Sequence, residues 1–255
     1  MKPVKIMKRA ALAGVATHAL VAMSFKPSPR QLLDPKWHTE IPIRLVMGRG
    51  MTWLLPNLYA HFGERGVKRL QYFFYQFGLD RAAMMQKYLQ IDPNDARSLG
   101  RILDYEDGLG GVRGTWVEES KGKATKEERY CPIAKELEKC PEVCTKLMMA
   151  MEAGTFVIIN PKLEIPEFDE LLSTGGSCCK GSIELAYLSE EEAAQESPHA
   201  THDAFPPVLK VPGLQWRLMA LGVISMFKAA FKLLTTDIDD IDMYQYDFIR
   251  YEPPR

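Results

Sequence analysis

Five cysteines are the residues of this chain with the clearest capacity for chemistry. They stand at positions 131, 140, 144, 178 and 179, and none lies outside this short region. Cys131 and Cys140 each precede a proline. Proline favours the first position of a helix, so each cysteine is expected at or next to a helix N-cap. Amide donors and the helix dipole at such a position stabilise a thiolate. Cys178 and Cys179 share a glycine-flanked turn. The grouping therefore predicts thiols gathered around one place in the fold.

Three uses of these thiols remain open at the level of sequence. A thiol at a helix N-terminus can act as a nucleophile, with Glu118 or Glu119 handling protons. Soft thiolates also suit zinc or an iron–sulfur cluster, and Cys131, Cys144 and Cys179 are the candidate ligands. The spacing contains no C-x-x-C pair, which argues against a zinc ribbon. Spacing alone favours the third use, in which the cysteines are small buried apolar residues.

Composition narrows the classes of protein that the chain can belong to. A hydrophobic fraction of 46% with 25% charged residues is typical of a globular protein. The 32 basic and 33 acidic residues balance, so no net field attracts a phosphate backbone and no nucleic-acid partner is expected. The odd cysteine number, in a chain of this size, argues against a secreted disulfide scaffold. We therefore expect a cytoplasmic protein with reduced thiols.

The elements that must position these thiols predict an α+β fold. Apolar spacing predicts helices over residues 41–89, with breaks at Gly48, Gly50 and Pro56 and an end at Gly78, and over residues 94–106. Alternation predicts a hairpin of residues 112–119 and 124–130, and strands at residues 155–159 and 181–188. Helices are expected after Pro132 and over residues 141–153. The predicted arrangement is a helical part followed by a small antiparallel sheet with flanking helices and a long amphipathic C-terminal helix.

The composition changes along the chain predict four segments. These are a helical part at residues 1–108, a cysteine-bearing α+β part at 109–190, an exposed linker at 191–212, and an amphipathic helix with its tail at 213–255. The basic, apolar start has the outline of a signal sequence without a clear cleavage site, so an amphipathic helix is the preferred interpretation. Residues 213–234 are mostly apolar with a narrow basic stripe, which favours packing in the core or against a second subunit of a homo-oligomer. Contact with a membrane surface is the alternative.

The order of these motifs resembles the L-2-amino-thiazoline-4-carboxylic acid hydrolase family. The resemblance covers residues 59–188 and rests on a Phe-Gly helix at Phe62, a Cys-Pro at Cys131, a helical cysteine at Cys144, and a glycine–cysteine turn that ends at Cys179. The family's usual acidic residue in that turn is Gly176 here. The resemblance implies an enzyme that opens a cyclic amidine or thiazoline with water, at a carbon–nitrogen bond that is not a peptide, with no cofactor required.

On that resemblance, candidate roles follow for individual residues. Cys131 or Cys179 is the nucleophile candidate and Glu118 the acid–base group. Arg113 or Lys180 would hold a substrate carboxylate, and Trp116 joins them as a candidate substrate-binding residue. Two alternatives stand beside the hydrolase. One is a cysteine-ligated metal or iron–sulfur protein with redox or organometallic chemistry, and the other is a non-enzymatic small-molecule-binding or membrane-surface module.

Overall fold

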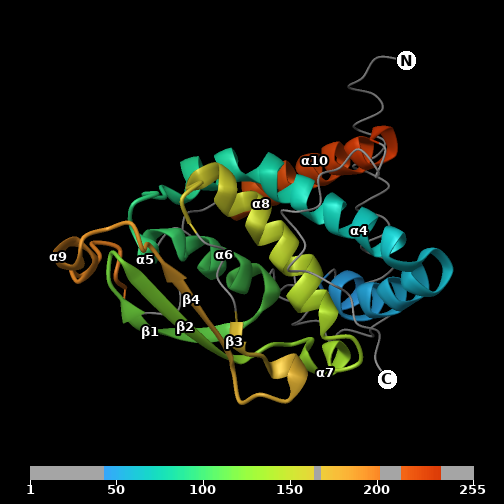
Figure 1. Cartoon of the computed structure of the whole chain (residues 1–255), viewed down its shortest axis with the longest axis horizontal. Helices are drawn as coiled ribbons and strands as arrows, with labels where there is room; N and C mark the ends of the chain where they lie inside the picture. Colours follow the sequence, from blue (N-terminus) through green and yellow to red (C-terminus); the bar gives the residue numbers. More distant parts are fainter. Residues whose placement is uncertain (1–42, 164–167, 202–213, 237–255) are drawn as a thin grey trace, which may run out of the picture.

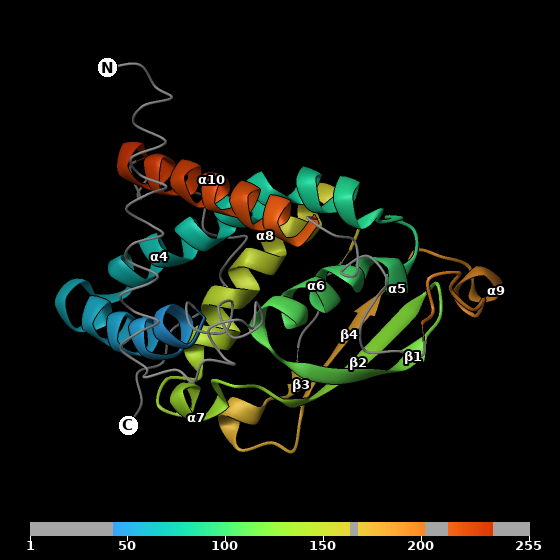
Figure 2. The same ribbon diagram turned by 180° about the vertical axis from the view of Figure 1, so that it is seen from behind.

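The computed structural model describes residues 43–163, 168–201 and 214–236. A helical half lies on one side and a four-stranded sheet on the other (Figure 1). Long helices α4, α8 and α10 make up the helical half. Shorter helices α5 and α6 lie across one face of the sheet, as the reverse view shows (Figure 2). The predicted α+β class, with its helical part, small antiparallel sheet and C-terminal helix, is confirmed.

The first described elements form one long helical run. The π-helical segment η1, Ile43–Gly50, leads into α4, Met51–Leu89. Gly48, Gly50 and Pro56, the predicted breaks, all lie inside this run. The break is at Gly63 instead, whose φ of 58° and ψ of −152° interrupt the helical backbone. A residue with a side chain rarely adopts that conformation, so glycine allows the chain to turn here.

The sequence predicted that Gly78 ends a helix, and this is wrong. Gly78 lies inside α4, where α4 crosses α8, Met149–Ile159. A Cβ at Gly78 would lie 2.1 Å from the carbonyl oxygen of Met151. A Cβ at Gly154 would lie 2.2 Å from the carbonyl oxygen of Tyr75. The two glycines therefore bring the backbones of α4 and α8 into direct contact.

Residues 155–159 form the last turns of α8, so the predicted strand at this place is wrong. Their β-branched side chains favour strands only weakly, and tertiary packing overrides such a preference. The Thr155 hydroxyl donates to the Met151 carbonyl, and it accepts from Arg81 Nε of α4 at 2.8 Å. The helix therefore continues because its final turns are bonded and packed against α4.

The sheet has the strand order β1-β2-β4-β3, and all its pairs are antiparallel. Strands β1, Arg113–Glu119, and β2, Lys123–Tyr130, form the predicted hairpin. The last predicted strand is present as β4, Cys179–Glu184, which begins and ends earlier than expected. Strand β3, Phe168–Glu170, was not predicted, because three residues are too few to show alternation.

The inner face of the sheet carries every second residue of β2 and β4. Ala124 and Ile183 belong to the buried core beneath α5, Ala96–Leu99, and α6, Arg101–Gly110. Lys126 and Glu128 share the face of Ala124, because side chains two apart on a strand point the same way.

The predicted helix at 94–106 is divided at Gly100, where a Cβ would lie 2.3 Å from the Trp116 ring. The helices and the sheet therefore pack closely enough for the inner face to be largely enclosed.

The remaining elements close the two ends of the sheet. Helix α7, Ala134–Leu137, segment η2, Val143–Met148, and the 3₁₀ turn η3, Leu172–Thr174, lie near one end, and α9, Glu190–Ala193, lies near the other (Figure 1). The segment predicted as an exposed linker contains a buried residue, because Ser197 is buried and its hydroxyl donates to Asp95. Helix α10, Leu214–Thr235, is confirmed and packs on α4 through Ser225 and Ala229. The predicted N-terminal helix, residues 202–213 and the C-terminal tail lie outside the described residues.

Candidate functional site

The five cysteines are free thiols that divide into two groups. Cys140 is fully buried in the core between α4, α7 and α8. Cys178 is also buried, and its sulfur lies 3.7 Å from Glu170 Oε2. Cys131, Cys144 and Cys179 are partly exposed. The expectation of thiols as small buried residues therefore describes Cys140 and Cys178, and the other three cysteines are only partly buried.

The three partly exposed cysteines lie close to one another and to Glu128, and we refer to these four residues as the thiol site. Glu128 on β2 is paired directly with Cys179 on β4. The β-carbons of such a pair lie about 4.5–5.5 Å apart. The pKa of Cys144 is raised by the negative charges that Cys131, Cys179 and Glu128 carry when ionised. The fold thus brings three separate parts of the chain together at one end of the sheet.

Local backbone geometry gives each thiol its own surroundings. Cys131 precedes α7, and the backbone N–H groups of Ile133 and Ala134 lower the pKa of its thiol, while the Ala134 N–H donates to the Cys131 carbonyl oxygen at 3.2 Å. Cys179 accepts from the Leu172 N–H at 3.4 Å. The Ser173 hydroxyl favours the thiolate of Cys144. Cys131 lies before a helix as predicted, but the N-cap is Ile133, two residues later, so the expected position at the helix N-terminus is wrong.

Burial nevertheless keeps all three thiols protonated near neutral pH. It raises the pKa of Cys131 to about 11, against the opposing effect of its two backbone donors. It raises the pKa values of Cys144 and Cys179 to about 12, and neighbouring thiols and Glu128 add to the shift. None of these thiols is a ready thiolate, so a nucleophilic role requires a base that takes the proton during attack.

Glu128, which is paired with Cys179, can serve as such a base. Burial raises its pKa to about 8, and the Asp107 carboxylate adds to the rise while Lys126 opposes it. Burial also raises the pKa of Asp107 to about 6, against Lys126. A carboxyl group with a pKa near ambient pH can both accept and return a proton. The alternation of Ala124, Lys126 and Glu128 along the predicted strand was the signal that could have identified Glu128.

The structure separates Glu118, the predicted acid–base group, from the thiol site. Trp116 pairs with Lys126 and Glu118 pairs with Thr125, so Val117 forms a bulge in β1. Without the bulge, Glu118 would share the inner face with Trp116; with it, Glu118 is exposed and accepts from the Thr125 hydroxyl at 3.2 Å. Thr125 alternates with Ala124 and Lys126 and so faces the opposite side. Glu118 therefore lies on the face of the sheet away from the thiols.

Trp116, a predicted substrate-binding residue, is buried and contacts a network of charged side chains. Its Nε1 donates to Asp104 at 2.9 Å, and the Arg97 guanidinium lies 4.3 Å from its ring centre. Asp104 also binds Lys126 at 2.8 Å and Arg97 at 2.9 Å. Arg97 and Asp104 are completely buried. These contacts hold α5 and α6 to the sheet, and they position Lys126 beside Glu128.

The other two predicted substrate-binding residues also lie away from the thiols. Arg113 is exposed, with its guanidinium 5.3 Å from the centre of the Tyr130 ring. Lys180 alternates with Cys179 and so faces the opposite side of the sheet, where it lies 3.6 Å from Glu127. The structure therefore brings together Cys131, Cys144 and Cys179, and it places Glu118, Arg113, Trp116 and Lys180 elsewhere.

The predicted metal site gains no support from the geometry. Within the described parts of the chain, no group of three or more histidine, cysteine, aspartate or glutamate side chains converges closely enough to hold a metal ion. Cys131, Cys144 and Cys179 are thus neighbours without the arrangement that zinc or an iron–sulfur cluster needs.

Comparison of the chain with protein-family models, with curated proteins and with solved structures found no match in any of the three. The resemblance to the thiazoline hydrolase family therefore stays a prediction from short motifs.

Proposed function

We propose that the thiol site is the active site of a hydrolase that opens a small cyclic amidine, such as a thiazoline, at a non-peptide carbon–nitrogen bond. The observation that carries this proposal is the direct pairing of Glu128 with Cys179, next to Cys131 and Cys144. A thiol and a carboxyl group with a raised pKa are the two groups that covalent hydrolysis of an amidine requires. The substrate class comes from the motif resemblance and the acid–base assignment from the structure.

Cys131 is the preferred nucleophile among the three thiols. Its pKa, about 11, is the lowest of the three, because two backbone N–H groups stabilise its thiolate. Cys179 has one such donor and a pKa of about 12, and it is the second candidate.

The proposed reaction uses one proton that Glu128 takes and returns. The sulfur adds to the central carbon of the protonated amidine, whose ring nitrogen already carries one proton, as the thiol proton passes to the Glu128 carboxylate. The carbon–nitrogen bond then breaks as Glu128 returns that proton to the departing ring nitrogen. Water attacks the remaining thioester-like adduct, releases the product and restores the thiol. Lys126, held by Asp104 and Asp107, limits the rise of the Glu128 pKa, so that a fraction of the carboxyl group is ionised at neutral pH.

Turnover of a 2-aminothiazoline carboxylate by single variants tests the proposal. Cys131→Ser and Glu128→Gln should each lower kcat about 100-fold or more, which is the usual contribution of a nucleophile or an acid–base group. Cys140→Ser and Glu118→Gln are the matched controls, since one thiol is in the core and one carboxylate is on the opposite face of the sheet. Full activity of all Cys131, Cys179 and Glu128 variants, or no turnover by the wild type, would overturn the proposal.

A second proposal concerns the surface of α10 and a peripheral contact with membranes. Its described outer face carries exposed apolar side chains: Val223, Ile224, Met226, Phe227, Phe231 and Leu234. Exposed Lys228 lies beside them, and α10 contains no acidic residue. Among the described helices, none is long and apolar enough to cross a bilayer. An apolar helix face with a lysine at its edge suits the surface of an anionic membrane.

Sedimentation with vesicles tests the membrane contact. The protein should bind vesicles that contain anionic lipid more strongly than neutral ones, and the paired change Phe227→Ser with Phe231→Ser should abolish this binding. Ile158→Ser on α8, where Ile158 is 52% exposed, is the control for the loss of an exposed apolar side chain. Equal sedimentation of the control and the double variant, or the absence of binding to both vesicle types, would contradict this assignment.

A further inference from the structure

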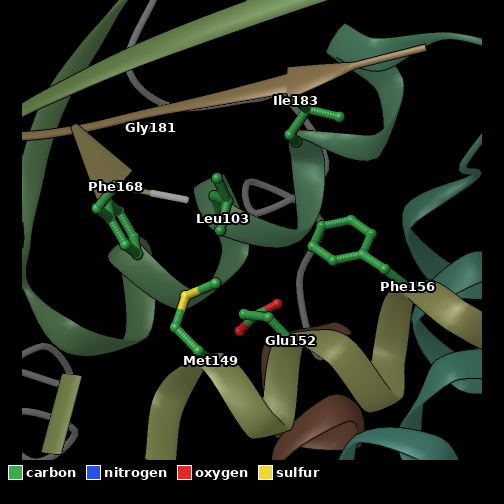
Figure 3. A pocket seen from close by; sticks show the side chains of 7 residues that line it. All are labelled: Leu103, Met149, Glu152, Phe156, Phe168, Gly181 and Ile183. Atoms are coloured by element: carbon green, nitrogen blue, oxygen red, sulfur yellow. The ribbon is translucent and has the colours of Figure 1, made fainter. Parts of the chain in front are cut away.

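The cavity beneath the sheet is too small to be the place where a substrate ring binds. It lies between α8, α6 and strands β3 and β4, and its volume is about 20 Å³, which is room for one water molecule (Figure 3). A thiazoline ring needs several times that space. A substrate of this kind must therefore reach the thiols from another side, and the packing around Cys131 and Cys144 decides which.

The chain before Gly63 forms an arm that is distinct from the rest of α4. We refer to residues 43–62, which are η1 and the first part of α4, as the arm. Because Gly63 has non-helical backbone angles, the helix changes direction sharply at this residue. The arm, drawn in blue, folds back from the end of the long part of α4 toward α7 and the start of α8 (Figure 1).

The arm packs against the segment that follows Cys131. A Cβ at Gly48 of the arm would lie 3.3 Å from the side chain of Ile133, the N-cap of α7. Leu55 of the arm is completely buried, in one apolar cluster with Ile133 and with Val143 of η2. Apolar contacts therefore hold the arm against α7 and η2.

Two of the three thiols lie against the same apolar cluster as the arm. Cys131 and Cys144 are partly buried and packed against it. Burial is the largest cause of the raised pKa of both thiols. Cys179 lies on β4 instead, and its sulfur accepts from the Leu172 N–H of η3. The arm therefore belongs to the packing that keeps water from Cys131 and Cys144.

Gly63 has the properties of a hinge. Its φ of 58° and ψ of −152° are almost restricted to glycine, and a Cβ here would meet nothing within 4 Å in the described part of the chain. The side chains of Thr52, Asn57 and His61 hydrogen-bond to carbonyl oxygens inside the arm, so the arm keeps these bonds when it moves as a unit. Both η1 and η2 are π-helical, a rare form that is frequent at functional sites.

We propose that the arm is a gate over the thiol site, which rotates about Gly63 and admits a small molecule to Cys131 and Cys144. The gate rests on the proposed function, because a hydrolase at these thiols needs a step that admits its substrate. In the closed position the arm keeps water and reagents from both sulfurs. In the open position both sulfurs are exposed like thiols on a surface. Such closure around a reacting group is a common step of enzymes.

Iodoacetamide labelling of the full chain, with mass spectrometry of each cysteine, tests the gate. Gly63→Ala strains the backbone of the closed position, so Cys131 and Cys144 should be labelled about tenfold or more faster than in the wild type at pH 7.5. Cys179 should keep its wild-type rate. Gly222→Ala is the matched control, because a Cβ there also has open space and the φ of Gly222 is not positive.

Met51→Ala loosens the closed arm at its contact surface, and it serves where Gly63→Ala does not fold. Met51 is partly buried against the apolar cluster, so its truncation should also speed the labelling of Cys131 and Cys144 several-fold. Met84→Ala is its control, since Met84 is partly buried against the other apolar cluster, between the sheet and its helices. The control should be labelled as the wild type is.

Labelling and turnover are measured separately, so that the two proposals can fail separately. Faster labelling of Cys131 and Cys144 alone, in Gly63→Ala or Met51→Ala, supports the gate, and absence of turnover by the wild type then overturns only the hydrolase. Wild-type labelling rates in both variants overturn the gate and leave the hydrolase. Equal acceleration of all five cysteines, completely buried Cys140 included, shows general unfolding and also overturns the gate.

Discussion

Glu128 on β2 lies directly opposite Cys179 on β4, on the face of the sheet that packs against the helices. The pairing places a carboxyl group with a pKa of about 8 beside thiols whose pKa values are about 11 or 12. Each group makes ionisation of the other harder, because like charges in a partly buried space repel. The site is therefore neutral at rest and acts through transfer of a proton.

Thiol alkylation should be slow in spite of partial exposure. At pH 7.5 the pKa of about 11 leaves Cys131 about 100-fold less thiolate than a thiol with an ordinary value of about 9. Iodoacetamide labelling followed by mass spectrometry should therefore show slow modification of Cys131 at neutral pH, with a rate that rises about tenfold per pH unit and levels off near pH 11. An unfolded sample at pH 7.5 provides the reference rate. Rapid labelling of folded Cys131 at neutral pH would show an activated thiolate and contradict this prediction.

Glu128 should make the folded protein less stable as the pH rises. Its pKa is about 4.5 in the unfolded chain and about 8 in the folded one, so the folded state alone retains the proton between these values. Folding then takes up a proton, and the free energy of unfolding falls as pH rises from about 4.5 to 8. The carboxylates of Asp107, Glu106 and Asp104 raise this pKa further, and Lys126 lowers it. Urea unfolding at pH 5.5 and pH 8 should show a smaller fall in Glu128→Gln than in the wild type or in Glu118→Gln. An equal fall in all three proteins would assign the pH dependence to other groups.

The buried charge network should tolerate the loss of its cation poorly. Lys126 binds Asp104 at 2.8 Å and Asp107 at 2.6 Å, and it is 2% exposed. Lys126→Met leaves these carboxylates without that partner and should lower the free energy of unfolding by about 3–5 kcal/mol. The exposed pair of Lys123 and Glu184 provides a control, and Lys123→Met should change stability by less than about 1 kcal/mol. Chemical denaturation of both variants measures the contrast, and similar losses would refute it.

The helix crossing at Gly78 and Gly154 should not accept a methyl group. A Cβ at either position would overlap a backbone carbonyl oxygen of the facing helix, so α4 and α8 would have to separate. Gly154→Ala should therefore destabilise the protein by about 1–3 kcal/mol or more. Gly222 in α10 has open space around its Cα, and Gly222→Ala should instead stabilise it by up to about 1 kcal/mol. Thermal unfolding compares the two, and an equal sign of the effect would argue against the close crossing.

Local pattern was sufficient for the elements whose partners are near in sequence. The hairpin of β1 and β2 was predicted from alternation around a short turn, and α10 from its apolar helical spacing. The cysteines and the helix start after Cys131 were also evident from residue types alone. These features depend on neighbours along the chain, which a sequence displays directly.

The tertiary structure decided which residues meet. Residues 155–159 became helix because α8 packs on α4, and Gly78 became a contact between helices instead of a helix end. A one-residue bulge at Val117 moved Glu118 to the opposite face, and the pairing of β2 with β4 placed Glu128 beside the thiols. The sequence by itself determined the reactive residue types and the local elements. Strand register, helix crossing and burial determined the site, because they depend on contacts between segments far apart in the chain.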